Sequence, residues 1–295
     1  MASQSHAANP HSRYYVPHPS AWPFALTVGL ALIVYGVAGW LEQRQVPTTL
    51  LVSAGALLAV YIIFSWFRGV ALESEHGAYN AQVDRTFRWG MSWFIFSEVM
   101  FFGAFFGALF YTRVLSVPWL GGAGAKLLTN LVLWPHFEAV WPSNGPAHIG
   151  GDFEPMEAWG LPAINTVLLI SSSFTVTWAH HALKDNRRGR CIAFMLLTIA
   201  LGATFLGLQA HEYIHAYTVQ NMTLHSGVYG STFFMLTGFH GLHVTLGTLM
   251  LIIITIRLAL GHFKPDHHFG FEGVAWYWHF VDVVWILLFT FVYVL

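Results

Sequence analysis

Seven apolar runs, each about as long as a lipid bilayer is thick, constrain the fold of this chain more than any other feature. A membrane-spanning helix needs about 20 apolar residues. The chain is 56% hydrophobic and 9% charged, whereas soluble domains carry about 25% charged residues. The sequence therefore predicts an all-α membrane protein with seven transmembrane helices. The predicted spans are 23–41, 49–67, 88–111, 161–182, 191–216, 228–258 and 273–294.

The spacing of these runs predicts the organisation of the chain. A polar N-terminal tail over 1–22 precedes a first helix pair over 23–68. An inner loop over 69–87 follows, and then a bundle over 88–295 with a long outer loop at about 114–159. The tail lacks the features of a cleaved signal peptide, so we expect it to be retained. The net charge of -1 does not favour nucleic acid as a partner,.

The distribution of Lys and Arg predicts the orientation in the membrane. With the N-terminus in the cytoplasm, ten of these residues fall on the inner side and three on the outer side. Inner segments are enriched in Lys and Arg, so we expect a cytoplasmic N-terminus and, after seven spans, an outer C-terminus. The inner set is Arg13, Arg68, Arg85, Arg88, Lys184, Arg187, Arg188, Arg190, Arg257 and Lys264; the outer set is Arg44, Arg113 and Lys126.

The stretch "QAHEYIHAY" at 209–217 matches H-E-x-x-H, the zinc protease pattern,. On a helix, His211 and His215 would share a face, with Glu212 as general base. A membrane metalloprotease needs a further ligand, often the Asp of an Asp-Gly pair, and the chain contains no Asp-Gly. The stretch also lies near the outer end of its helix, which favours a coincidental match.

Ionisable side chains within the spans form a second candidate site. At about 1.5 Å rise per residue, Glu98, His243 and Asp282 lie near the bilayer midplane. One interpretation is a polar cluster that fixes helix packing; others are a haem, a metal site or a proton relay. His279 and Asp282 are three residues apart on one helix face, as are His240 and His243,.

Cationic and aromatic residues at the inner helix ends suggest a lipid site. Arg68 and Arg257 end their predicted helices, and Trp66 lies near Arg68. Two interpretations stand side by side: the arginines extend to the interface and set topology, or they bind a lipid phosphate. The histidine pairs 180–181 and 267–268 lie at inner ends, where we expect interfacial residues rather than metal ligands.

Several stretches resemble subunit III of haem–copper cytochrome c oxidase, in the bacterial form. The resemblance runs from "WPFALT" near residue 22 to the last helix, with each stretch in the expected order. The Gln-Ala-x-Glu-Tyr pattern of that family is also matched at 209–213. The most specific stretches are "SEVMFF" (97–102), "WGLPAINT" (159–166), "TWAHHAL" (177–183), "VYGSTFFMLTGFHGLHV" (228–244), "HFGFEG" (268–273) and "WYWHFVDVVW" (276–285).

The resemblance implies a fold and a function. The seven helices would form two groups, I–II and III–VII, around a V-shaped cleft that holds phospholipids. The chain would carry no haem or copper, because haem a and copper belong to partner subunits I and II, through which cytochrome c acts. It would support proton uptake by subunit I and the stability and assembly of the complex in a bacterial inner membrane. The family glutamate maps to Glu98, and the lipid-cleft arginines map to Arg68 and Arg257.

Three alternatives remain open. Subunit III of a quinol oxidase typically lacks the first two helices, which are present here. A transporter would need a polar pathway across the membrane, and the sequence shows no internal repeat. A haem-binding membrane cytochrome would show a Soret band in the purified chain.

Overall fold

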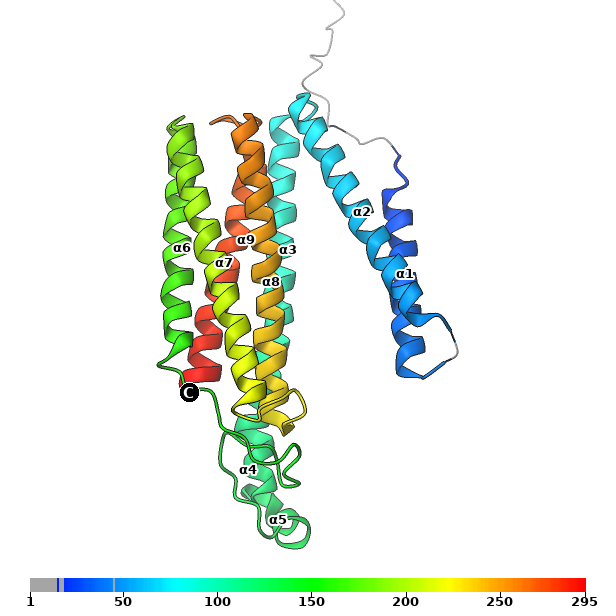
Figure 1. The fold of residues 1–295 in the computed structure, drawn as a ribbon, viewed down its shortest axis with the longest axis vertical. Coiled ribbons are helices and arrows are strands. Elements are labelled where there is room, and N and C mark those ends of the chain that lie inside the picture. The colour runs from blue at the N-terminus through cyan, green and yellow to red at the C-terminus, as the bar shows by residue number, and fades with distance from the viewer. Residues whose placement is uncertain (1–14, 16–18, 45) are drawn as a thin grey trace, which may run out of the picture. The chain divides into compact units, whose positions relative to one another are not determined.

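The computed structural model describes residue 15, residues 19–44 and residues 46–295. The expected tail over 1–22, with Arg13, therefore lies mostly outside the described residues. Within them the chain is helical without a β-strand, and seven helices are long and apolar enough to cross a membrane, which confirms the all-α membrane fold. The main helices (Figure 1) are α1 (Trp22–Leu41), α2 (Thr48–Glu75), α3 (Ala81–Phe110), α6 (Leu161–Lys184), α7 (Arg188–Thr218), α8 (Gly227–Leu260) and α9 (Phe269–Leu288).

The chain divides into two compact units, 1–87 and 88–295. In the first unit α1 and α2 touch through glycines. A Cβ on Gly55 would lie 2.7 Å from the carbonyl oxygen of Gly29, and a Cβ on Gly29 would lie 3.3 Å from that of Gly55. Only glycine permits this backbone approach, as in small-residue contacts between membrane helices.

The segment 69–87, expected to be a loop, is mostly helix. α2 continues to Glu75 and α3 begins at Ala81, so Arg68 lies within α2 rather than at its end. Helices persist outside the bilayer when polar residues replace apolar ones, so hydropathy underestimates their length. In the short turn, Tyr79 donates to Glu73 Oε2 at 2.7 Å. The pKa of Tyr79 is raised above its ordinary value, chiefly because the side chain is partly buried and secondly because of this hydrogen bond.

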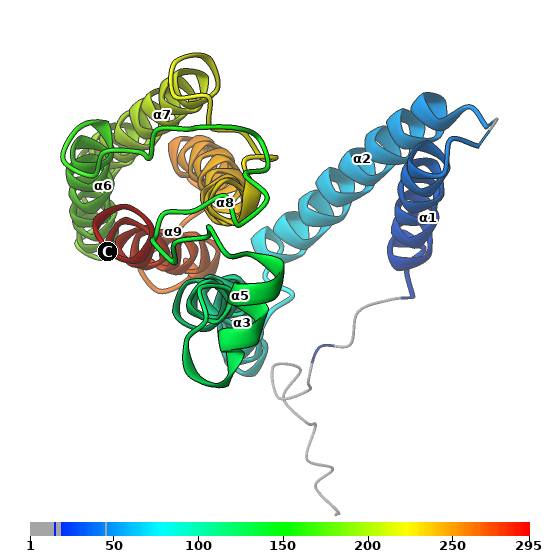
Figure 2. The ribbon, with the colours of Figure 1, turned by 90° about the horizontal axis from the view of Figure 1, so that it is seen from below.

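The second unit packs around two tryptophans of α9. Trp278 and Trp285 are fully buried, and each donates its indole N–H to α6: Trp278 to Ser172 Oγ and Trp285 to Thr166 Oγ1, both at 2.9 Å. Seen along the helices (Figure 2), α8 lies inside an arc formed by α7, α6 and α9. The two buried indole rings therefore hold α9 in the bundle, and their N–H groups are satisfied by hydroxyl groups of α6,.

The outer loop is more helical than expected. After α3 the helix continues through a π-helix, η2 (Tyr111–Ser116), and α4 (Val117–Leu120). A 3₁₀ turn, η3 (Gly124–Lys126), leads to a further short helix, α5 (Leu127–Leu133). The chain ends in a second π-helix, η4 (Phe289–Val294).

The irregular part of the outer loop is fixed to the α7–α8 connection. Asn221 Nδ2 donates to the carbonyl oxygen of Asp152 at 2.9 Å. Backbone hydrogen bonds join Glu154 N to Gln220 O and Tyr229 N to Ser143 O. These bonds attach the loop to the ends of two spanning helices.

Candidate functional site

The candidate site is the set of polar side chains inside the 88–295 bundle. Glu98 on α3 and His243 on α8 meet, with Glu98 Oε2 lying 2.9 Å from His243 Nε2. His243 Nδ1 lies 2.6 Å from the carbonyl oxygen of Phe239. A carbonyl only accepts, so Nδ1 carries the proton. The contact therefore joins either a neutral acid to a neutral imidazole or a carboxylate to an imidazolium, and both arrangements are neutral overall.

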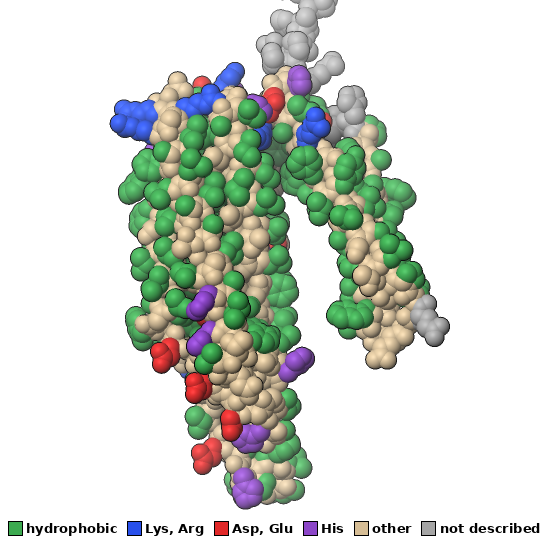
Figure 3. Space-filling model, in the orientation of Figure 1, with side chains coloured by type: hydrophobic (Ala, Val, Ile, Leu, Met, Phe, Trp, Pro, Cys, Tyr) green, Lys and Arg blue, Asp and Glu red, His purple; other side chains and the backbone are tan. Residues whose placement is uncertain are grey.

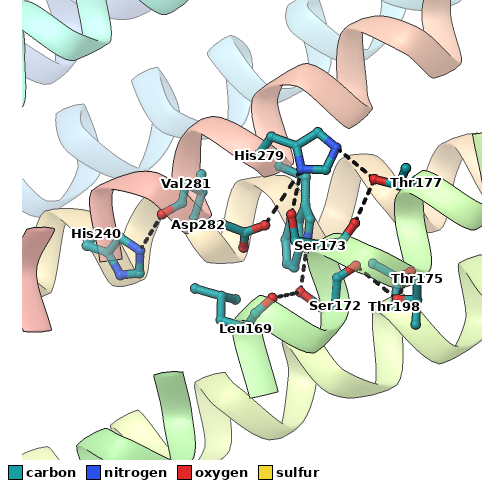
Figure 4. Close-up of polar contacts among 11 residues, drawn as sticks. Leu169, Ser172, Ser173, Thr175, Thr177, Thr198, His240, His279, Val281 and Asp282 are labelled. Carbon is teal, nitrogen blue, oxygen red and sulfur yellow. Dashed lines mark hydrogen bonds and ion pairs between the residues drawn. The ribbon is translucent and has the colours of Figure 1, made fainter. Parts of the chain in front are cut away.

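His279 on α9 is held by two hydroxyl groups of α6 (Figure 4). Thr177 donates its proton to Ser173 O, so its oxygen can accept from His279 Nε2 at 3.3 Å. The other ring nitrogen, Nδ1, then accepts from Ser173 Oγ at 2.6 Å,. Because these two contacts use both ring nitrogens, His279 is satisfied by α6.

Asp282 is buried one turn further along α9, and neither of its carboxyl oxygens has a hydrogen-bond partner. Its Oδ2 lies 3.9 Å from His279 Nδ1, which is too long for a hydrogen bond,. That nitrogen presents a lone pair, so it does not stabilise a carboxylate.

His240 on α8 is fully buried and contacts the backbone of α9. Its Nε2 donates to the carbonyl oxygen of Val281 at 3.2 Å. His240 also packs against Trp285, with ring centroids 5.0 Å apart. It thus links α8 to α9 through its ring and one nitrogen.

The five predicted residues therefore form separate contacts rather than one cluster. Glu98 lies 2.9 Å from His243, the possible partner that similar depth suggested, and His279 lies 3.9 Å from Asp282 on α9. The roles of these residues stay predictions. The contacts of Glu98, His240 and His279 each connect two helices, which is what a packing role requires,, whereas the contact between His279 and Asp282 lies within α9. Among the described residues, no three His, Cys, Asp or Glu side chains converge as a metal site would need.

The H-E-x-x-H match is divided between two faces of α7. His211 and His215 are exposed, whereas Glu212 is buried and accepts a hydrogen bond from Tyr293 Oη at 2.7 Å. This geometry does not suit a zinc site. Sequence reasoning missed the Glu212–Tyr293 contact, although the buried series Gln209, Glu212 and Ala216 follows a helical period,.

Two of the lipid candidates, Arg68 and Trp66, lie inside the last third of α2, and Arg257 lies in the last turn of α8. Arg68 is exposed on α2 and Trp66 is half-buried two residues earlier. Residues two apart on a helix do not face each other. Arg257 lies one turn before the end of α8, and its guanidinium is 4.9 Å from the centre of the Phe263 ring.

The two histidine pairs at the inner ends contact each other. His180 Nε2 lies 3.1 Å from His268 Nε2, so α6 is joined to the start of α9. His181 and His267, the other members of the pairs, are exposed. His180 and His268, which were expected to be interfacial residues, therefore form a contact between α6 and the start of α9.

Comparison with known proteins identifies the family. The family described as "Cytochrome c oxidase subunit III" matches residues 11–295. The chain belongs to this family. Proteins named cytochrome c oxidase subunit 3 from Latimeria chalumnae (37% identical), Pongo abelii (40%) and Danio rerio (40%) align over 99% of this chain and 98% of their own length. The matches and the presence of α1 and α2 do not favour the quinol oxidase alternative, and place the chain in an oxidoreductase complex.

Proposed function

We propose that the chain is the non-catalytic third subunit of an aa-type cytochrome c oxidase. In this proposal subunits I and II carry haem a and copper, and cytochrome c reacts through them. The observation that most strongly supports this proposal is the family match over residues 11–295. Further support comes from the bundle, where Glu98, His240 and His279 bond to other helices of the same chain.

Purification from native membrane tests this assignment. The proposal expects haem a absorbance and copper in the intact complex, with this chain and two redox-bearing subunits in equal amounts. The chain separated from that complex should contain no stoichiometric metal. About one iron, copper or zinc per separated chain would contradict the non-catalytic role.

We also propose that the chain binds phospholipid through Arg68, Trp66 and Arg257, with Glu98 facing lipid tails through the exposed part of its side chain. A guanidinium pairs well with phosphate where water is scarce. Arg68 is exposed on α2, and the Glu98 side chain is 22% exposed. The lipid-filled cleft that the resemblance implies stays a prediction.

Replacing Arg68 and Arg257 with Ala should lower the phospholipid retained per complex and leave the haem spectrum unchanged. Arg190→Ala is the control, because Arg190 is an exposed arginine on the same inner side. Equal lipid content in the double variant and the control would refute the assignment.

The proposed location is a bacterial inner membrane with a cytoplasmic N-terminus and a periplasmic C-terminus. The support is the charge asymmetry of the sequence. Figure 3 shows most of the visible Lys and Arg side chains at the upper end of the view, and several Asp and Glu side chains toward the lower end. In this location the chain supports proton uptake by subunit I and the endurance and assembly of the complex.

A further inference from the structure

The short helix α5 of the outer loop exposes its apolar side chains and packs its polar side chains against the rest of the loop. Its apolar side chains point outward: Leu128 is 73% exposed and Val132 is 71% exposed. Its polar residues, Thr129 and Asn130, are half-buried against the rest of the loop. A surface helix normally presents the opposite faces to solvent and to the core. The exposed set is Leu127, Leu128, Leu131, Val132 and Leu133.

Asn130 holds this arrangement in place. Its side-chain Nδ2 lies within hydrogen-bond distance of three carbonyl oxygens, those of Leu120 at 3.2 Å, Trp134 at 2.9 Å and Phe137 at 3.3 Å, which share its two protons,. These bonds attach α5 to the end of α4 and to the turn that follows. The outward position of the leucines is therefore built into the loop by a specific polar contact.

The location of α5 argues against burial in the hydrocarbon layer. Arg88 and Arg113 lie 25 residues apart on one continuous helix, which is roughly 37 Å at 1.5 Å per residue. The hydrocarbon core is about 30 Å thick, so the two arginines flank it. α5 follows Leu120, roughly 10 Å further along the helix, and Figure 1 shows α4 and α5 beyond the outer ends of α7, α8 and α9.

The charge of the loop argues against a membrane surface as the occupant. Four carboxylates between α5 and α6 are exposed, and Lys126 is the only Lys or Arg between α4 and α6. Anionic lipids would repel such a loop, because membrane surfaces attract cationic segments. A protein with cationic side chains around an apolar patch would complement both features. The carboxylates are Glu138, Asp152, Glu154 and Glu157.

We propose that the outward leucine face of α5 is a docking surface for a protein domain outside the membrane, one that presents an apolar patch bordered by Lys and Arg. Exposed apolar patches on soluble surfaces commonly mark interaction sites. The apolar face supplies the buried contact, and the carboxylates of the same loop steer and orient the partner,. This role goes beyond the function proposed above and requires no redox centre in the chain.

Photocrosslinking in intact membranes tests the proposal. A benzoylphenylalanine is placed at Leu128 or Val132 of the full chain in its complex, and at Ile149 as control, since Ile149 is 58% exposed on the same loop outside α5. We expect one protein adduct at 128 and 132, absent at 149, with the crosslinked partner peptide flanked by Lys or Arg. Lipid adducts, or no adduct at 128 and 132, would overturn the proposal.

A second experiment measures how substitutions that change charge affect the yield of the crosslinked adduct. The adduct yield at position 128 should fall at least about tenfold in Val132→Asp, because one Asp places a charge in the apolar contact. It should also fall in Glu138→Gln with Glu157→Gln, and with added salt. An adduct yield insensitive to both the carboxylates and salt would contradict the cationic border. Ile149→Asp, which adds the same charge outside α5, should leave the yield unchanged.

Discussion

At the scale of single residues, one shared proton defines the Glu98–His243 contact. His243 Nδ1 is committed to Phe239, so the contact contains one proton between the carboxyl group and Nε2. An isolated charge deep in a span is costly, and either form of the pair avoids a net charge. The contact therefore explains why a carboxyl group is tolerated on α3 and how α3 is attached to α8.

Replacement of Glu98 separates hydrogen bonding from titration. Glu98→Gln can still donate to His243 Nε2, so proton pumping, initial oxygen consumption and the melting temperature of the complex should stay near normal. Glu98→Ala leaves that nitrogen without a partner, which costs about 1–3 kcal/mol, and should lower the melting temperature. Loss of pumping in an intact Glu98→Gln complex would give Glu98 an obligatory role instead.

The buried Glu212 offers a second prediction at this scale. Tyr293→Phe removes the hydrogen bond to Glu212 Oε1, and Oε2 already has no partner. The cost should be about 1–3 kcal/mol, seen as a lower melting temperature of the complex. Tyr217→Phe is the control, since this exposed ring packs against Phe234 and keeps that contact without the hydroxyl. Equal melting temperatures would show that water or another group satisfies Glu212.

Sequence reasoning located the ionisable residues but not their hydroxyl partners. Glu98 and His243 were placed together because helical rise converts position into depth. Ser173 and Thr177, which satisfy His279, gave no such signal, because hydroxyl residues are common in membrane helices and also bond to their own backbone,. The rotation of each helix about its axis decides such contacts. An almost wholly apolar helix has no polar stripe in its sequence from which that rotation could be predicted.

At the scale of elements, all seven spans were predicted, and most errors lie at their ends. Hydropathy follows the bilayer, whereas helix formation continues into water, so α2 and α3 extend beyond their predicted limits. Helix contacts through glycine were also missed, because a glycine has no side chain that marks a contact. Trp278 is one example: it fits between Gly202 of α7 and Gly247 of α8.

Substitution of these two glycines should loosen the bundle. A Cβ on Gly202 would lie 2.7 Å from Trp278 Cη2, and one on Gly247 would lie 2.9 Å from Trp278 Cε3. Either Gly→Ala change should cost about 1–3 kcal/mol through overpacking, measured as lower thermal stability. Gly207→Ala and Gly241→Ala are matched controls on the same helices, because their Cβ atoms would meet nothing within 4 Å. Equal effects in all four variants would point to backbone propensity instead of packing.

At the scale of the whole molecule, the chain shows a separation of charge that hydropathy alone does not require. Ten Lys and Arg residues lie in the segments assigned to the inner side and three in those assigned to the outer side. The long outer loop carries exposed carboxylates instead. Topology follows the placement of cationic residues near span ends, so the asymmetry predicts one orientation for the full chain.

Reporter fusions measure that orientation directly. Alkaline phosphatase, which is active only outside the cytoplasm, should be active after Leu295 and inactive in the α6–α7 turn at residues 185–187. The turn is flanked by Lys184, Arg188 and Arg190, which should stay inside because moving cationic residues across the membrane is disfavoured. A green fluorescent protein fusion, which fluoresces only inside, should give the opposite pattern at the same two positions. Activity of the phosphatase in the turn, with fluorescence at the C-terminus, would reverse the proposed topology and place the leucine face of α5 in the cytoplasm.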